Sequence, residues 1–357
     1  MSEDHPIRVG IAGLGRTGWR KHLPNYESRS ELFNIVAACD VDEQRAAAAA
    51  SRVGCKTYTK VEDLIADPEV ELIDIATRSC DHHSQAIAAL EAGKSVMVEK
   101  PMALTYKQAM AMADVSRRTG SPLLVYHNRR FDAPFCHVRE VISSGILGEV
   151  FDIEMRCHSY VRRDDWQTLM RYGGGQLLNW GPHLIDQALR LLDSPVTDTW
   201  SDLKRVVSLG DTEDSFRIML RGNNRRVIDV RMSAGAAIDE PLFTVLGTRG
   251  GLTCNKKQIN LRYLDPSTPL PSRTIHEETP EWYGGYASPD DLKWICETID
   301  VNPTPGLFKL DIWNCLYETI KHGKTFPIAL DEAVEVMRIM DLVKKGTEFE
   351  RTDCANQ

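Results

Sequence analysis

The chain has 357 residues, of which 42% are hydrophobic and 26% charged, a composition typical of globular proteins and sufficient for two hydrophobic cores. Its net charge of −8 disfavours nonspecific binding to nucleic acid or to an anionic membrane surface. No apolar run is long enough to predict a transmembrane helix, and the acidic N-terminus does not resemble a signal peptide. The nine cysteines are scattered without a Cys-x-x-Cys pair, which favours reduced thiols in a cytoplasmic protein over a disulfide framework or a zinc site.

Strand-like and helical patterns alternate through the first third of the chain. Strands are expected at 7–12, 34–40, 71–76, 95–98 and 122–127, with helices near 16–28, 42–52, 82–92 and 105–118. This alternation predicts an α/β domain over residues 1–128, built on a parallel, doubly wound sheet. Right-handed crossovers place ligands at the carboxyl ends of such strands, so the residues after each strand are candidates for a binding site.

A glycine-rich turn joins the first expected strand to the first expected helix. Gly13, Gly15 and Gly18 have the spacing that lets backbone amides close on a pyrophosphate at a helix N-terminus. Asp40 ends the second expected strand, where a carboxylate accepts ribose hydroxyl groups. Together they predict a dinucleotide-binding domain, and the alternative is an ordinary tight turn with a strand-end aspartate. The residues expected to contact the cofactor here are Gly13, Leu14, Gly15, Arg16, Thr17 and Asp40.

The same aspartate bears on which dinucleotide is bound. The carboxylate of Asp40 would repel a 2′-phosphate, and the first cation after it along the chain is Arg45. The sequence therefore favours NAD over NADP.

A lysine follows the fourth expected strand of this domain. In the order Glu99, Lys100, Pro101, it stands where the carboxyl end of the strand faces the cofactor. Partial burial there would lower the pKa of the amine and let it share a proton near neutral pH. The alternative is a surface lysine before a turn proline.

After Gly148 the pattern changes to extended runs separated by turns. One more helix is expected near 132–144, with Asp132 as its N-cap. Further strands are expected at 150–158, 216–220, 226–232, 243–246 and 258–263, a turn at 247–251, helices near 184–193, 289–299, 306–322 and 331–345, and a long surface excursion at 264–287. These runs predict a second domain, residues 129–357, with a largely antiparallel sheet.

A second chemical motif begins with three glycines at 173–175, which allow close approach of the backbone or a mobile entry to a site. Asn179 and His183 are four residues apart and would share one face of a helical turn. Pro182 places His183 near the start of a helix. Histidine is the side chain best suited to proton transfer at neutral pH, and the alternative is a buried histidine whose hydrogen bonds are satisfied.

In this order, the motifs resemble the oxidoreductase family of glucose–fructose oxidoreductase, inositol 2-dehydrogenase and the MocA-like proteins. The resemblance extends over essentially the whole chain and is most specific at the lysine and histidine motifs. The matching segments are 13–18, Asp40, Ala76 and Thr77 with His82, 89–94, 99–101, 128–131, 148–150, 173–186, 246–251 and 326–328.

The resemblance implies a Rossmann domain followed by an α+β domain with a large, mostly antiparallel open sheet that commonly forms the subunit interface. A homodimer, homotetramer or higher homo-oligomer is therefore expected, with the C-terminal helices able to pack back on the first domain. The usual reaction is hydride transfer between a hydroxyl group of a sugar, glycoside or cyclic polyol and a nicotinamide. Oxidation of a glycoside at C3 falls within this class. NAD is the implied cofactor, and whether it leaves between turnovers stays open.

The resemblance also implies roles for particular residues. Lys100 bridges cofactor and substrate and lowers the pKa of the hydroxyl group, and His183 is the general acid/base. Many members have an aspartate where this chain has Asn179, which can hydrogen-bond a substrate hydroxyl but cannot take its proton. Asp186 either orients His183 in its place or is a structural carboxylate. Further cofactor contacts are expected from Thr77, His82, Glu99, Lys100 and Arg129.

Substrate recognition is encoded less clearly. Aromatic faces, carboxylates and guanidinium groups suit carbohydrate, and the alternative is a solvated loop. Arg78 stands where the family often has proline, so the loop over the cofactor is expected to differ. The cluster at 81–83 has no matching acid or histidine set and the family has no catalytic metal, so no metal is expected. The candidate substrate residues are Tyr160, Arg163, Asp165, Trp166 and Asn179.

Two other functions stay open. In a redox-elimination glycosidase, bound NAD would transiently oxidise C3 and so permit elimination, giving net hydrolysis without accumulation of NADH. A nucleotide-sensing regulator on the same fold would need no catalytic groups, and the presence of both Lys100 and His183 argues against it.

Overall fold

The computed structural model describes residues 5–275, 277 and 290–350. Its first sheet has six parallel strands in the order β3-β2-β1-β4-β5-β6, which confirms the doubly wound α/β domain. The order of strands reverses between β1 and β4, the position where open α/β sheets bind ligands. The strands are β1 (Ile7–Ala12), β2 (Phe33–Cys39), β3 (Lys56–Tyr58), β4 (Leu72–Ile75), β5 (Ser95–Val98) and β6 (Leu123–Val125).

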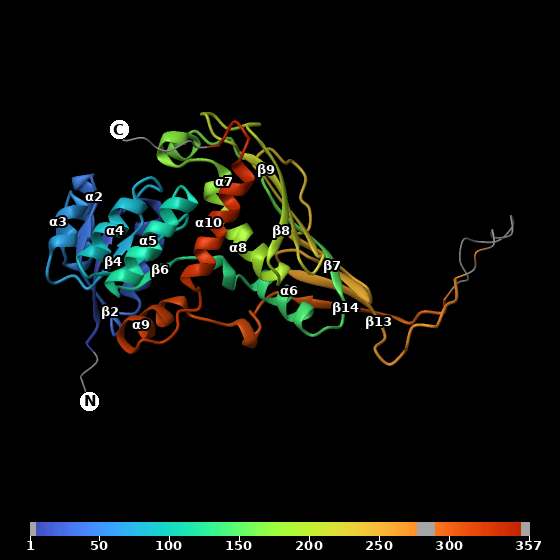
Figure 1. The fold of residues 1–357 in the computed structure, drawn as a ribbon. Coiled ribbons are helices and arrows are strands. Elements are labelled where there is room, and N and C mark those ends of the chain that lie inside the picture. The colour runs from blue at the N-terminus through green and yellow to red at the C-terminus, as the bar shows by residue number, and fades with distance from the viewer. Residues whose placement is uncertain (1–4, 276, 278–289, 351–357) are drawn as a thin grey trace.

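Helices cover both faces of this sheet (Figure 1). One face carries α3 (Val61–Ala66), α4 (His82–Glu91) and α5 (Tyr106–Thr119), and the other carries α1 (Leu23–Glu27) and α9 (Ile312–His322). A π-helical turn η1 (Gly18–His22) leads into α1, and α2 (Glu43–Val53) follows β2.

Local sequence explains where these helices begin and end. Asp42 caps α2 because its carboxylate accepts the Gln44 N–H at 3.0 Å, and Thr105 caps α5 through the Gln108 N–H at 3.2 Å. Gly54 ends α2 in the left-handed conformation that glycine adopts without strain. The short elements β3 and α3 carry too little periodicity to be predicted, and they lie in what was expected to be a connection.

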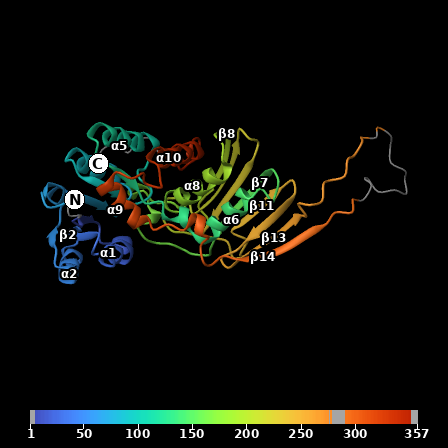
Figure 2. The ribbon, with the colours of Figure 1, turned by 90° about the horizontal axis from the view of Figure 1, so that it is seen from below.

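The second sheet has eight strands in the order β14-β13-β12-β11-β7-β10-β9-β8. All neighbours are antiparallel except β7 and β10, which confirms the mostly antiparallel sheet. Described helices cover one face of it, whereas no described helix covers the other (Figure 2). Its strands are β7 (Val150–His158), β8 (Val196–Lys204), β9 (Ser215–Gly222), β10 (Val227–Ser233), β11 (Phe243–Gly247), β12 (Gly250–Cys254), β13 (Gln258–Leu264) and β14 (Trp294–Asp300).

The remaining helices lie beside this second sheet or join it to the first domain. They are η2 (Asn128–Phe131), α6 (Ala133–Ser143), η3 (Trp166–Thr168), η4 (Met170–Tyr172), α7 (Gln176–Asn179), α8 (Gly181–Leu192), η5 (Gly306–Phe308) and α10 (Leu330–Lys344). No described helix is both long and apolar enough to cross a membrane.

The prediction of a helix near 289–299 is wrong, because the described part of this segment contains strand β14. Trp294, Ile295 and Ile299 are aromatic or β-branched residues that favour a strand, and the segment pairs with β13 along its whole length. The helix expected at 306–322 begins only at Ile312, after Asp311, whose carboxylate accepts the Trp313 N–H at 3.0 Å. Of the expected excursion, residues 276 and 278–287 lie outside the described residues.

Two C-terminal helices pack against elements distant in sequence. The side chains of Ile312, Trp313 and Leu316 on α9 join the same buried cluster as Ile7 and Tyr26 of the first domain. Helix α10 lies between α5 and α8, so it contacts both halves of the molecule (Figure 1).

Candidate active site

The residues that follow the first-sheet strands gather at one edge of the sheet. Gly13 follows β1, Asp40 follows β2, Glu99 follows β5, and Thr77 and His127 lie just beyond the ends of β4 and β6. Because the strands are parallel, their carboxyl ends lie along the same edge, as the sequence predicts.

The glycine turn has two structural glycines and one that faces open space. Gly13 has a φ of +92°, and a Cβ there would lie 2.6 Å from the carbonyl oxygen of Ala76. A Cβ on Gly18 would overlap the carbonyl oxygen of Gly13. A Cβ on Gly15 would meet no protein atom within 4 Å. The side of the turn at Gly15 therefore fits close approach by a pyrophosphate, and the exposed Arg16 and the half-buried Thr17 flank it.

Asp40 braces the glycine turn. Its Oδ2 accepts the Leu14 N–H at 2.8 Å, and its Oδ1 accepts the Asp42 N–H at 2.9 Å. Each carboxylate oxygen can accept a further bond, so ribose hydroxyl groups fit here as well. The Arg45 guanidinium lies 3.7 Å from Oδ1 of Asp40. Although Arg45 is five residues further along the chain, the fold places its charge beside this carboxylate.

His82 ties two loops of the edge together. Its ring is buried, with Nδ1 lying 2.8 Å from the carbonyl oxygen of Pro101 and Nε2 lying 3.3 Å from that of Thr77. The Thr77 hydroxyl donates to Oε1 of Gln85 at 2.7 Å. His82 therefore supports the loops after β4 and β5. Among the described residues, no three His, Cys, Asp or Glu side chains form a metal-binding group.

Lys100 reaches from the first domain to the second. Its Nζ donates to the backbone oxygen of Asn179 at 2.8 Å and lies 3.3 Å from Oδ1 of the same residue. The Asn179 amide donates to Oε1 of Gln176 at 3.2 Å, which turns Oδ1 toward the lysine. Burial lowers the pKa of Lys100 to about 8 although Glu99 opposes the shift. The amine therefore titrates near neutral pH.

His183 lies at the start of α8. Helix α7 ends at Asn179 and α8 begins at Gly181. Asn179 and His183 therefore lie on two consecutive helices rather than on the single helical turn that their spacing predicts. The His183 ring is 7% exposed and packs edge-on against the rings of His127 and Trp180, at centroid distances of 6.5 and 6.2 Å. Its buried Nδ1 makes no hydrogen bond to a described residue.

Several causes keep the His183 imidazole neutral. Burial lowers its pKa well below the ordinary value, and the charges of Lys100 and Arg129 lower it further. Burial likewise lowers the pKa of His127. A neutral imidazole can accept a proton, so His183 has the form that a general base needs at neutral pH.

Asp186 is paired elsewhere and does not orient His183. Its Oδ2 accepts from the Nε of Arg130 at 3.0 Å, and its Oδ1 accepts from the same guanidinium. Arg130 also pairs with Glu332 and donates to the carbonyl oxygen of Pro327 at 3.2 Å. This buried network joins α8 to α10, so Asp186 is a structural carboxylate.

Arg129 has a different set of partners. Its guanidinium stacks on the Trp180 ring at 4.4 Å and pairs with Asp132 at 2.9 Å. Asp132 does hold the N-cap position of α6, but its carboxylate makes no capping bond because it pairs with Arg129. Arg129 thus lies beside the ring that packs on His183.

The expected substrate residues lie in the loop that supports the three glycines. Tyr160 is 61% exposed, Arg163 pairs with Asp165, and Trp166 begins η3. Within the described residues, none of these four side chains hydrogen-bonds Lys100 or His183. Their contact with the edge stays a prediction.

The glycines themselves are tightly packed. A Cβ on Gly174 would lie 2.6 Å from the carbonyl oxygen of Gln167, and the Gly175 N–H donates to that oxygen at 2.8 Å. A Cβ on Gly173 would lie 2.6 Å from the Leu104 side chain of the first domain. The glycines therefore serve close packing, Gly173 against the first domain and Gly174 and Gly175 within the second, rather than a mobile entry.

One group near this edge, His22, carries no motif signal, because it lies four residues beyond Gly18 in a helix-compatible run. His127 ends a strand-like run, so the sequence places it at this edge but assigns it no role. The Arg78 guanidinium stacks on the Tyr172 ring at 4.4 Å, which links the loop after β4 to η4. The unusual residue at position 78 therefore has a partner in the second domain.

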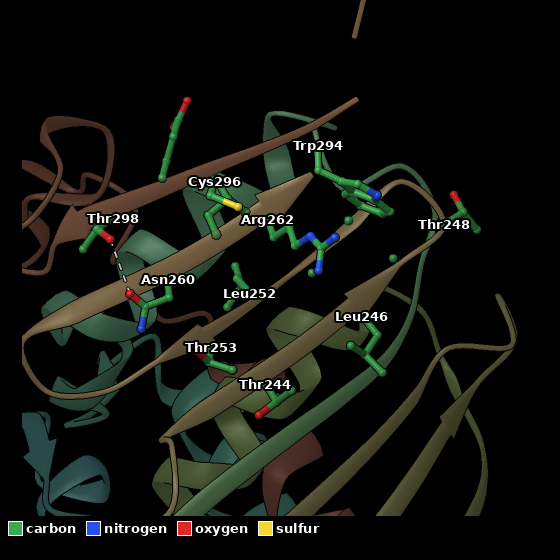
Figure 3. A pocket seen from close by; sticks show the side chains of 15 residues that line it. Thr244, Leu246, Thr248, Leu252, Thr253, Asn260, Arg262, Trp294, Cys296 and Thr298 are labelled. Atoms are coloured by element: carbon green, nitrogen blue, oxygen red, sulfur yellow. Dashed lines mark hydrogen bonds between the residues drawn. The ribbon is translucent and has the colours of Figure 1, made fainter. Parts of the chain in front are cut away.

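A separate hollow lies away from this edge. A cavity of about 630 Å³ occupies the uncovered face of the second sheet, where Leu246, Arg262 and Trp294 point outward (Figure 3). It is lined by residues of β11 to β14 and their turns, and not by Lys100 or His183.

Two family models match the chain. One, described as an oxidoreductase family with an NAD-binding Rossmann fold, matches residues 7–127, and the other, the GFO/IDH/MocA C-terminal domain, matches residues 135–253. Its first domain is thus an NAD(P)-binding Rossmann domain. The chain belongs to the Gfo/Idh/MocA oxidoreductase family.

Similar proteins cover most of the chain. The uncharacterized oxidoreductase C26H5.09c of Schizosaccharomyces pombe is 32% identical, over 71% of this chain and 73% of that protein. The D-glucoside 3-dehydrogenase of Escherichia coli is 30% identical over 53% and 55%, and the scyllo-inositol 2-dehydrogenase (NADP(+)) of Bacillus subtilis is 25% identical over 97% and 95%. The crystal structure of an NAD-binding protein from Listeria innocua superposes with a TM-score of 0.79 at 26% identity, covering 97% of this chain and 96% of that one.

Proposed function

We propose that this protein is an NAD-dependent dehydrogenase acting on a hydroxyl group of a sugar, a glycoside or a cyclic polyol. The observation that carries the proposal is the meeting of Lys100 and the Asn179–His183 segment at the switch-point edge of the sheet. A bound nicotinamide would accept the hydride from the carbinol carbon. A glycine turn open at Gly15 and a carboxylate at Asp40 are what such a dinucleotide requires.

The protein's own residues would manage the proton and the developing charge. Neutral His183 takes the hydroxyl proton, and the ammonium form of Lys100 stabilises the negative charge that grows on the oxygen. Asn179 holds Lys100 in place through two neutral oxygens, so it positions the amine without compensating its charge. Burial of His183 keeps water away from the reacting group.

The cofactor is NAD in this proposal, although the similar inositol dehydrogenase is named for NADP. Asp40 supports NAD because its carboxylate, at the end of β2, would face a 2′-phosphate. Arg45 lies near this carboxylate, but its Nε lies 3.4 Å from the Asp42 carboxylate. Part of the Arg45 guanidinium is therefore engaged by Asp42. Whether NAD dissociates in each turnover is part of the test below.

The substrate class rests on the relatives and on the loop chemistry. One relative is named for a glucoside and its C3 position, and another for an inositol. Tyr160, Arg163, Asp165 and Trp166 supply the aromatic and charged groups that suit such ligands. A cyclic polyhydroxylated substrate, including a glycoside oxidised at C3, is therefore proposed.

We also propose that the uncovered sheet face is a contact between copies of the chain. Leu246 and Trp294 are 44% and 42% exposed there, and the hollow in Figure 3 runs between them. Paired apolar side chains on an open sheet favour burial against a second copy. Light scattering at micromolar concentration tests it, with a dimer or larger assembly expected and a monomer contradicting it.

Two further assignments complete the proposal. The boundary between the domains is placed at 128/129, within η2, which precedes α6. The eight described cysteines are all free, which supports a reducing, cytoplasmic location.

The experiment is a screen of purified protein against sugars, glycosides and inositols at the absorbance and fluorescence band of reduced nicotinamide, with and without added NAD. A rise that needs added NAD supports a dehydrogenase with an exchangeable cofactor. A rise limited to one equivalent, without added NAD, supports a tightly held cofactor. Net hydrolysis of a glycoside without NADH favours the redox-elimination glycosidase, and no response to any polyol contradicts the proposal.

A further inference from the structure

His22 is a fully buried histidine between two carboxylates. Its Nδ1 lies 2.7 Å from Oδ2 of Asp74, and its Nε2 lies 3.0 Å from Oε1 of Glu99. Ionised carboxylates only accept hydrogen bonds, so both ring nitrogens must donate. The ring is therefore an imidazolium, held between β4 and the residue after β5.

The surroundings of His22 agree with this charge. Burial opposes it, but the carboxylates of Asp74 and Glu99 outweigh burial and raise the pKa of His22 to about 10. The other groups around the ring are neutral aromatic side chains, Tyr126 at 5.0 Å and Trp313 at 5.5 Å between centroids. Burial raises the pKa of Glu99, but the hydrogen bond and the charge of His22 outweigh it and lower this pKa to about 2.

Glu99 carries the contact onward to the lysine. Its Oε1 accepts from His22 and its Oε2 accepts the Lys100 N–H at 3.0 Å, so both carboxylate oxygens are fixed. His22 lies at the end of η1, directly after the glycine turn. A chain of three hydrogen bonds therefore joins Asp74 in β4, the helix that follows the glycine turn and the backbone of Lys100.

We propose that His22 is a positioning residue: its imidazolium holds Glu99 ionised and in place, and Glu99 in turn sets the position and charge of Lys100. The proposal rests on the proposed function only in taking Lys100 as the working lysine. Neither the glycine turn nor Asp40 contacts Glu99 in this way, so positioning the lysine is a role specific to His22.

The lysine faces one anion and several cations. Burial lowers the pKa of Lys100, Glu99 raises it, and Lys21, Arg129 and Arg16 lower it. Any change in the charge or position of Glu99 must therefore move the pH at which the amine titrates. Without the imidazolium, the buried carboxylates of Asp74 and Glu99 lose the cation that lies between them, which is costly for buried charges.

The test measures the titration of Lys100 in the full chain, without any substrate. Competitive labelling with acetic anhydride across pH, followed by mass spectrometry of the Lys100 peptide, gives the midpoint of that amine. The variants are His22→Gln, Glu99→Gln and the double variant, each compared with wild type. The matched control is His137→Gln, which removes another buried histidine, bonded to the carbonyl oxygen of Pro303 at 3.0 Å on a different helix.

The wild-type midpoint is expected near pH 8, and His22→Gln is expected to displace it by about half a unit or more. Because His22 acts through Glu99, the same substitution should displace the midpoint little in the Glu99→Gln background. His137→Gln should leave it unchanged. An unmoved midpoint in His22→Gln, or an equal displacement in both backgrounds, overturns the proposal.

A second measurement uses only the wild-type protein, so it does not depend on whether a variant folds. In wild type labelled with ¹⁵N-histidine, one of the ten histidines should keep its imidazolium signal above pH 9, because His22 titrates near pH 10. Loss of every imidazolium signal by pH 8.5 would overturn the proposal. Neither readout requires turnover, so a wrong substrate class would leave both results interpretable.

Discussion

The amine of Lys100 lies 2.8 Å from the backbone oxygen of Asn179, so one hydrogen bond joins the loop after β5 to the end of α7. The side-chain oxygen of Asn179 lies 3.3 Å from the same amine. Both acceptors are neutral. Position 179 therefore holds the lysine without the negative charge by which an aspartate there would favour the ammonium more strongly.

Asn179→Asp is expected to raise the pKa of Lys100 above about 8, because a carboxylate beside the amine favours the ammonium. If turnover needs the ammonium, the loss of rate at high pH moves to higher pH in the variant. The check is the rate profile between pH 6 and 10, with Asn179→Ala as the neutral comparison. A profile that moves to lower pH would contradict this account of the lysine.

Lys100→Met is expected to lower kcat by roughly 10²–10⁴-fold, the range typical of a lost proton-transfer or charge-stabilising group. The variant should still bind cofactor, because the glycine turn and Asp40 are untouched. NADH fluorescence titration measures binding, and Lys107→Met on the exposed side of α5 is the control. Unchanged turnover would refute the assignment of Lys100.

His183→Asn should lower kcat over a similar range, roughly 10²–10⁴-fold, with the fold retained. Burial holds the pKa of His183 well below the ordinary value, so the imidazole stays neutral as pH falls from 7.5 to 6.5. The wild-type rate should therefore not drop in this window on account of His183. A drop with its midpoint near 6.5 that disappears in His183→Asn, but persists in His137→Asn, would be inconsistent with a neutral base.

Asp40→Ala should weaken NAD binding and shift preference toward NADP. Loss of hydrogen bonds to a charged group costs about 1.5–3 kcal/mol, which corresponds to roughly tenfold or more in affinity. Removing the carboxylate also takes away one of the two carboxylates that lie near Arg45, so the guanidinium can more readily meet a 2′-phosphate. The measurement is the ratio of kcat/KM for the two cofactors, with Asp42→Ala as the control. A ratio that does not change would mean that Asp40 only braces the turn.

The contribution of His22 to stability should depend on pH. Its folded pKa of about 10 lies above the ordinary 6.5, so the stabilisation is full below pH 6.5 and is lost as pH rises through 10. Lys100, whose pKa is lowered, changes stability in the opposite direction, so the informative quantity is a difference. The gap in Tm between wild type and His22→Gln should narrow from pH 6 to pH 10. A gap that widens would show that the ring is neutral in the fold.

The sequence predicted the class of the first domain and five of its six strands, all except β3. The glycine turn, Asp40 and Lys100 follow strands, and strand ends in a parallel sheet meet by geometry alone. By contrast, β14 was expected to be a helix, because its pairing with β13 depends on a partner strand that local periodicity does not report.

The networks around the site are the part that sequence could not supply. His22 meets Asp74 and Glu99 across 52 and 77 residues of chain, and Asp186 meets Arg130 across 56. Such partners are set by how helices pack on the sheet, and no spacing rule relates them. The same limit applies to Gly173, whose close neighbours Leu104, Ser79 and Cys80 come from the other domain.

The most direct test of the central claim is a stoichiometric measurement on the polyol that responds in the screen. Purified protein, NAD and substrate are mixed, NADH is followed by absorbance, and the product is identified by mass spectrometry. We expect one carbonyl product, two hydrogens lighter than the substrate, for each NADH formed, and formation of that product roughly 10²–10⁴-fold slower with Lys100→Met. A hydrolysed glycoside with no net NADH, or a Lys100→Met variant as active as wild type, would contradict it.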